Sequence, residues 1–125
     1  MTNRKTKLRD LAISDLVHRF SEIALQQYDC VERNENDRFS KLFAQMKEVV
    51  DELRSRPGDA RTKLVLLYAH PNRQVRLKAA IHTLAINRDA ARRILEEIAK
   101  DTFYPQALDA GFALQNMDRG IFRPT

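Results

Sequence analysis

The side chains in this sequence whose chemistry is most evident are cations gathered in the middle of the chain. No acidic residue occurs between Asp59 and Asp89, and that interval contains six basic residues: Arg61, Lys63, Arg73, Arg76, Lys78 and Arg88. Guanidinium and ammonium groups at this density are typical of surfaces that bind carboxylates or phosphates. Together with the basic N-terminus, the segment more than accounts for the formal net charge of +5.

One predicted helix carries much of this charge. Gln74, Lys78 and His82 recur at four-residue steps and so share a face, while Arg73 and Arg76 lie near the helix N-terminus, whose dipole also favours anions. We expect an acidic protein partner to bind a surface made of Arg61, Lys63, Arg73, Arg76, Lys78 and His82. The alternative is a solvated face in which Arg76 pairs with a neighbouring carboxylate.

A second hypothesis for the same charge is sequence-independent binding of nucleic acid through residues 60–88 and the N-terminal arm. It rests on charge alone, because the chain has no tryptophan and Tyr68 is the only aromatic residue among the cations. Stacking on unpaired bases therefore has little support.

Aromatic residues near the C-terminus provide another candidate surface. Phe103 and Phe112 are expected in the core, whereas Tyr104 and Phe122 are candidates for exposed aromatics that could contact a second copy of the chain or another partner. Alternatively, the C-terminal tail folds back and covers the last helix.

The sequence predicts no catalytic residue, no metal site and no cofactor. The three histidines, at positions 18, 70 and 82, have no metal-ligand spacing, and Cys30 has no base near it in the sequence. No glycine-rich phosphate loop or nucleophile elbow occurs. We therefore expect a protein that is not an enzyme.

Composition and periodicity predict an all-α fold. Apolar residues make up 43% of the chain, with only three glycines and four prolines. Apolar side chains recur at helical spacing in about six segments, near residues 11–32, 39–53, 59–70, 72–84, 89–99 and 105–118. Candidate N-caps are Asn34 or Asn36, Asp59, Asn72, and Asn87 or Asp89. The continuously apolar third segment is expected to be a buried central helix.

The expected organisation is a basic flexible arm at residues 1–9 followed by a single helical-repeat domain at residues 10–125. No segment approaches the roughly 20 consecutive apolar residues that cross a membrane. A single cysteine cannot form an intrachain disulfide, which fits a reducing compartment, and cytoplasm is the predicted location.

The second half of the chain resembles HEAT and armadillo-type repeats. Two helix pairs each contain a short turn with Pro71 or Pro105, and His70-Pro71-Asn72-Arg73-Gln74-Val75-Arg76 followed by Ala79-Ala80 is similar to the second helix of a HEAT repeat. The second pair has Ala107-Leu108 where Val-Arg would stand. The resemblance implies antiparallel helical hairpins in an α-α superhelix, with the N-terminal helices as a cap.

Most of the chain also resembles an uncharacterised bacterial family of short HEAT-like proteins known as a domain of unknown function. The resemblance is carried by Val49-Val50-Asp51-Glu52-Leu53, Arg56-Pro57-Gly58-Asp59, His70-Pro71-Asn72, Asp109-Ala110-Gly111 and Asp118-Arg119-Gly120-Ile121-Phe122. It implies a bacterial source and supplies no catalytic residue. The function expected from the sequence is therefore a non-enzymatic protein-binding module, of adaptor or inhibitor type, that uses the helical-repeat surface.

Overall fold

The computed structural model describes residues 7–125, and helices are the only regular secondary structure in that range. Their bounds are η2 Leu8–Asp10, α1 Ile13–Arg33, α2 Asn36–Ser55, η3 Ala60–Ala69, α3 Arg73–Thr83, α4 Arg88–Ala99 and α5 Gln106–Asp118, where η denotes a 3-10 helix. The prediction of an all-α fold with about six helices is confirmed. The HEAT-like arrangement of these helices stays a prediction.

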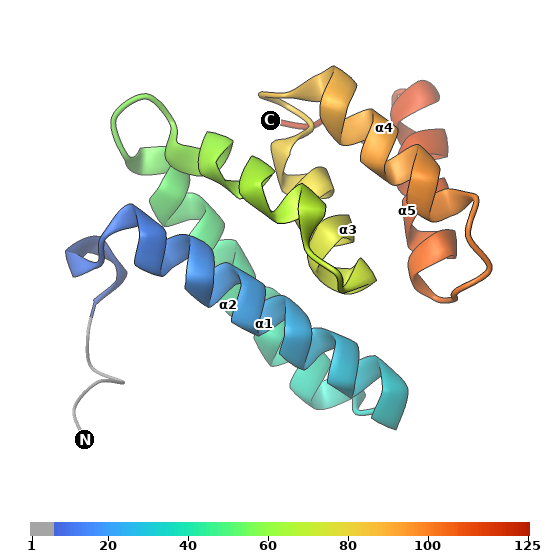
Figure 1. The fold of residues 1–125 in the computed structure, drawn as a ribbon, viewed down its shortest axis with the longest axis horizontal. Coiled ribbons are helices and arrows are strands. Elements are labelled where there is room, and N and C mark those ends of the chain that lie inside the picture. The colour runs from blue at the N-terminus through green and yellow to red at the C-terminus, as the bar shows by residue number, and fades with distance from the viewer. Residues whose placement is uncertain (1–6) are drawn as a thin grey trace. The chain divides into compact units, whose positions relative to one another are not determined.

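The chain forms two compact units, with the boundary between Lys63 and Leu64, inside η3. In the N-terminal unit, α1 and α2 pair as a helical hairpin (Figure 1). The buried side chains of α1 include Leu16, Phe20 and Ile23, at the three- and four-residue steps expected from the sequence.

The turn between α1 and α2 differs from the sequence prediction. Asn34 has a φ of 59° and ends α1 in the left-handed region, which asparagine adopts more readily than most residues. The N-cap of α2 is Glu35, whose side chain makes no capping hydrogen bond. The predicted cap at Asn34 or Asn36 is therefore wrong, because Asn34 serves the preceding helix.

Arg56, directly after α2, fixes the start of the described chain. Its Nη2 donates to the carbonyl oxygens of Leu8, at 3.1 Å, and Leu11, at 2.8 Å, while its Nε pairs with Glu52 at 2.7 Å. Leu8 and Arg9, which fall in the predicted arm, lie in η2; residues 1–6 of that arm lie outside the described residues.

The third predicted helix exists, but it is a 3-10 helix and is not buried. A 3-10 helix has three residues per turn, so side chains three apart share a side. Leu64 is accordingly buried and Leu67 half-buried, whereas Leu66 is 74% exposed. The continuous run of apolar residues in η3 therefore does not mean that this helix is buried on all sides.

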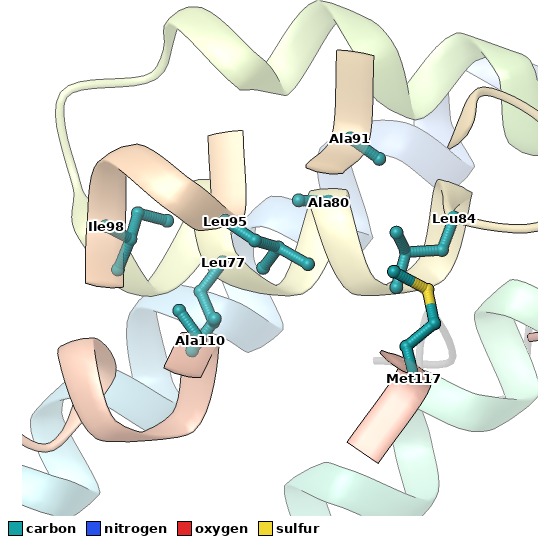
Figure 2. Close-up of a cluster of buried hydrophobic side chains, with 8 residues drawn as sticks. All are labelled: Leu77, Ala80, Leu84, Ala91, Leu95, Ile98, Ala110 and Met117. Carbon is teal, nitrogen blue, oxygen red and sulfur yellow. The ribbon is translucent and has the colours of Figure 1, made fainter. Parts of the chain in front are cut away.

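The C-terminal unit has a well-defined core made by α3, α4 and α5. Figure 2 shows Leu77 and Ala80 of α3, and Leu84 directly after it, among apolar side chains of the other two helices. The full cluster is Leu77, Ala80, Leu84, Ala91, Leu95, Ile98, Ala110 and Met117. Because such cores are close-packed, truncating one of its leucines to alanine should cost about 2–5 kcal/mol.

Two polar contacts fix α3 within this unit. Oδ1 of Asn72 accepts hydrogen bonds from the backbone N–H groups of Gln74, at 2.8 Å, and Val75, at 3.3 Å, which confirms the predicted N-cap. At the other end of α3, Thr83 hydrogen-bonds to the hydroxyl of Tyr68 in η3.

Candidate docking face on helix α5

Arg61, one of the six residues of the predicted basic surface, forms an ion pair within the fold. Its guanidinium is buried and donates two hydrogen bonds to the Asp59 carboxylate, from Nε to Oδ1 at 2.8 Å and from Nη2 to Oδ2 at 2.6 Å. Hydrogen bonding with Arg61 lowers the pKa of Asp59, and the same contact raises the pKa of Arg61. Arg61 is thus a structural residue, while Lys63 is exposed.

The other four residues of that surface lie on α3 in the C-terminal unit, and each is half-buried. The guanidinium carbon of Arg73 lies 3.7 Å from the centre of the Phe103 ring. Nε of Arg76 is buried and has no hydrogen-bond partner among residues 7–125. His82 lies in the last turn of α3. These cations therefore do not form an exposed stripe, which weakens the predicted surface for acidic proteins or phosphates.

Lys78, also half-buried, faces Asp109 of α5. Burial lowers the pKa of Lys78, and the negative charge of Asp109 opposes that change. Burial also raises the pKa of Asp109, against the effect of Lys78. The positive charge at Lys78 is thus disfavoured by its surroundings and balanced by a neighbour, which is typical of a packing contact.

A buried hydrogen bond fixes the first turn of α5 against α3. Nε2 of Gln106 donates to Oε1 of Gln74 at 3.1 Å, and both side chains are fully buried. Because an unmet amide in the interior is costly, this contact sets the rotation of α5 about its axis. Ala107, Ala110 and Met117 consequently lie on the buried side of the helix.

Large apolar side chains on α5 and in the segment directly before it are exposed. Phe103, Tyr104, Leu108 and Phe112 are 49%, 62%, 49% and 56% exposed, respectively. The sequence placed Phe103 and Phe112 in the core, and this is wrong: Ala107 and Ala110 occupy the core side of α5, and Phe103, before the helix, lies under the guanidinium of Arg73. Phe122, expected to be exposed, is half-buried and packs against the core of the C-terminal unit.

The outward side chains form a regular stripe. Leu108, Phe112, Gln115 and Arg119 are exposed and recur at steps of four, three and four residues, which is the spacing of a helix-packing seam. We call this stripe, together with Tyr104 before it and Gly111 beside it, the α5 face. Sequence reasoning identified Tyr104 alone. The spacing of this stripe can be read from the sequence, but Leu108 and Phe112 are apolar like the residues of the opposite side, and periodicity does not tell which side of α5 is buried.

The N-terminal unit contains a groove of about 460 Å³ between α1 and α2. Its lining includes Arg19, Glu22 and Glu48. This mixed charge selects no ligand class.

Two further findings concern residues 7–125 as a whole. No group of three or more histidine, cysteine, aspartate or glutamate side chains in this range could hold a metal ion. Within the same range, no helix combines the length and the apolar character needed to cross a membrane.

Comparison with known proteins places this chain in a family. The chain is similar to the crystal structure of the protein RPA1889 from Rhodopseudomonas palustris CGA009, with 42% identity, a TM-score of 0.92, and coverage of 96% of this chain and 99% of that one. No curated protein matches it. Residues 14–118 match the model of a domain of unknown function, DUF2019. The expected resemblance to an uncharacterised family is confirmed: the chain belongs to the DUF2019 family.

Proposed function

We propose that this chain is a non-enzymatic protein-binding module whose docking surface is the α5 face. The observation that carries the proposal is the exposure of three large apolar side chains of this face, Tyr104, Leu108 and Phe112, with the exposed Phe103 directly before them. Contiguous exposed apolar side chains mark interaction sites far more often than isolated ones do, and aromatic residues are enriched at interface hot spots.

The geometry of the face favours a helix as the bound element. A stripe at steps of four, three and four residues presents a straight seam of side chains, and such a seam is complementary to the apolar side of another helix. In a HEAT-like array the outer face of the last helix is also where a following repeat would stack. The α5 face is such an end surface if the predicted repeat arrangement holds.

The support comes from this apolar face rather than from the predicted basic surface. Arg61 of η3 is held by Asp59, and Arg73 of α3 stacks on Phe103, so neither presents its whole guanidinium to a partner. An acidic partner remains compatible with the α5 face, because Arg119 lies exposed at one end of the stripe.

The proposal is tested by capture of bound proteins from nuclease-treated host lysate on the tagged chain. Phe112→Ser should reduce the recovered amount of at least one protein, including an untagged copy of this chain, by about tenfold. Phe43→Ser on α2 is the matched control, because Phe43 is a similarly exposed phenylalanine, at 53%.

Circular dichroism of both variants should show unchanged helical content. A set of captured proteins that is identical for the chain and its Phe112→Ser variant would show that the α5 face is not a docking surface. In a parallel capture from untreated lysate, nuclease-sensitive material as the only captured component would instead support binding of nucleic acid.

A further inference from the structure

Gly111 is a feature of α5 that the fold itself does not explain. It lies in the interior of the helix, where glycine is less favourable than alanine because it loses more conformational freedom on folding. A Cβ at this position would meet nothing within 4 Å, and the backbone there does not have the positive φ that favours glycine. No contact among residues 7–125 therefore requires the missing side chain. Close approach of another backbone would require it.

The α5 face also has the pattern of a surface that can pair with itself. Gly111 and Phe112 lie at the middle of α5, which runs from Gln106 to Asp118. In an antiparallel pair of α5 helices centred there, the two phenylalanines lie near the two-fold axis, and each Leu108 faces the Gln115 region of the second copy. Both copies then use the same set of residues to contact each other, as in an isologous interface.

The two ends of the stripe carry different side chains. Arg119 and Arg123 are exposed at its C-terminal end, beside Asp118, which pairs with Arg92, whereas Lys100, Asp101 and the exposed ring of Tyr104 precede its N-terminal end. Antiparallel pairing brings Arg119 of each copy towards Tyr104 and Asp101 of the other, whereas parallel pairing would bring the two Arg119 side chains together. Arginine stacks well on aromatic rings, as Arg73 does on Phe103 within this chain.

We propose that the partner of the α5 face is a second copy of this chain, joined through antiparallel packing of α5 on α5 across a two-fold axis with close contact at Gly111. This inference rests on the proposed function, since it names the occupant of the same face. The partner is not a heterologous protein, and one α5 face occupies the other completely.

Sedimentation equilibrium of the purified chain, at concentrations spanning roughly two orders of magnitude, tests the inference. The expected result is a monomer–dimer equilibrium with a dissociation constant on the order of 1–100 µM, as suits a modest interface. Phe112→Glu should weaken it by more than about tenfold, while Phe43→Glu on α2 should leave it unchanged. Gly111→Ala should weaken dimerisation while keeping or improving folding, so its effect is not a result of unfolding.

A charge exchange tests the antiparallel geometry. Arg119→Glu and Asp101→Arg should each weaken self-association, because each places like charges together at both ends of the pair. An equimolar mixture of the two variants should form heterodimers more strongly than either variant forms homodimers, because both ends are then complementary. Absence of this recovery would overturn the antiparallel pairing.

The possible outcomes separate this inference from the proposed function. One outcome is that the purified chain has the mass of one copy at every concentration while capture from lysate still depends on Phe112. In that case the proposal of a second copy as the partner is wrong, and the α5 face remains the docking surface. If neither depends on Phe112, both are wrong. A dimer insensitive to Phe112→Glu overturns the inference as well, because another surface then forms it.

Discussion

Arg73 of α3 lies over the ring of Phe103, with 3.7 Å between the guanidinium carbon and the ring centre. The ring presents its negative face to the cation, and the contact joins the N-terminus of α3 to the segment between α4 and α5. This segment leads directly into the α5 face, so the pair helps to position Tyr104 and the start of the stripe.

Replacing Phe103 should reveal the strength of this contact. Phe103→Leu retains apolar area but loses the ring, and we expect the free energy of unfolding to fall by about 0.5–1 kcal/mol. Phe103→Tyr keeps the aromatic face and should retain most of the stability. Urea denaturation of the two variants measures the difference, and equal losses for leucine and tyrosine would show that the stacking contributes nothing.

The Gln74–Gln106 hydrogen bond should show strong coupling in a double-mutant cycle. Gln74→Leu alone leaves the Gln106 amide buried without its partner and should cost about 1–3 kcal/mol, as should Gln106→Leu alone. The double variant should be more stable than the sum of the two losses predicts, because no amide is then orphaned. Additive losses, measured by chemical denaturation, would mean that the two amides do not depend on each other.

The Asp59–Arg61 pair should make stability depend on acidic pH. Asp59→Asn keeps a residue type that tolerates the φ of 57° but leaves Arg61 buried without its counterion, and should cost about 1.5–3 kcal/mol at neutral pH. Because hydrogen bonding to Arg61 puts the folded-state pKa of Asp59 below its ordinary value of 3.8, the contribution is present above that pH. It disappears as the pH falls through the folded-state pKa.

The difference in unfolding free energy between the chain and Asp59→Asn should therefore shrink below about pH 4. The control is the double variant Asp59→Asn with Arg61→Met, which removes the buried cation together with its partner. Its free energy of unfolding should fall by less than that of Asp59→Asn alone. A difference that stays constant down to the acid limit of folding would contradict a role for the charge.

The charge of Lys78 should have the opposite effect on the free energy of unfolding. Burial puts the folded-state pKa of Lys78 below its ordinary value of 10.5, so the charged lysine opposes folding at neutral pH. Lys78→Met should raise the free energy of unfolding there, since the cost of burying the ammonium group outweighs its attraction to Asp109. The advantage should vanish as the pH rises from the folded-state pKa towards 10.5, where the lysine is neutral in both states. Destabilisation by Lys78→Met at neutral pH would show that the pair with Asp109 outweighs burial.

Sequence patterns predicted those features of the fold that depend on local chemistry. The cap at Asn72 followed from its side chain and the residues directly after it, and the helix positions followed from apolar periodicity. Asn34 shows the limit of this reasoning, because asparagine suits both the end of one helix and the start of the next. In the structure Asn34 ends α1, and Glu35 precedes α2.

The candidate site was less predictable because it depends on tertiary packing. Ala107 and Phe112 lie on different faces of one helix, and the larger side chain is the exposed one. Hydrophobicity alone predicts the reverse. This orientation depends on tertiary contacts: Ala110 and Met117 pack in the core, and the hydrogen bond from Gln106 to Gln74 joins residues 32 positions apart and has no local sequence signal.

Gly111 offers a last test, because its effect on the monomer and its effect on association should differ in sign. Gly111→Ala removes the entropic penalty of glycine in a helix interior and introduces a methyl group that meets no other part of the described chain within 4 Å beyond the adjacent residues and the nearby backbone of its own helix. We expect the free energy of unfolding to rise by about 0.5–1 kcal/mol, measured at low protein concentration so that self-association does not contribute. A decrease in stability of the monomer would mean that Gly111 has a role within the chain. The close approach of a second helix would then no longer be needed to explain why a glycine occupies this position.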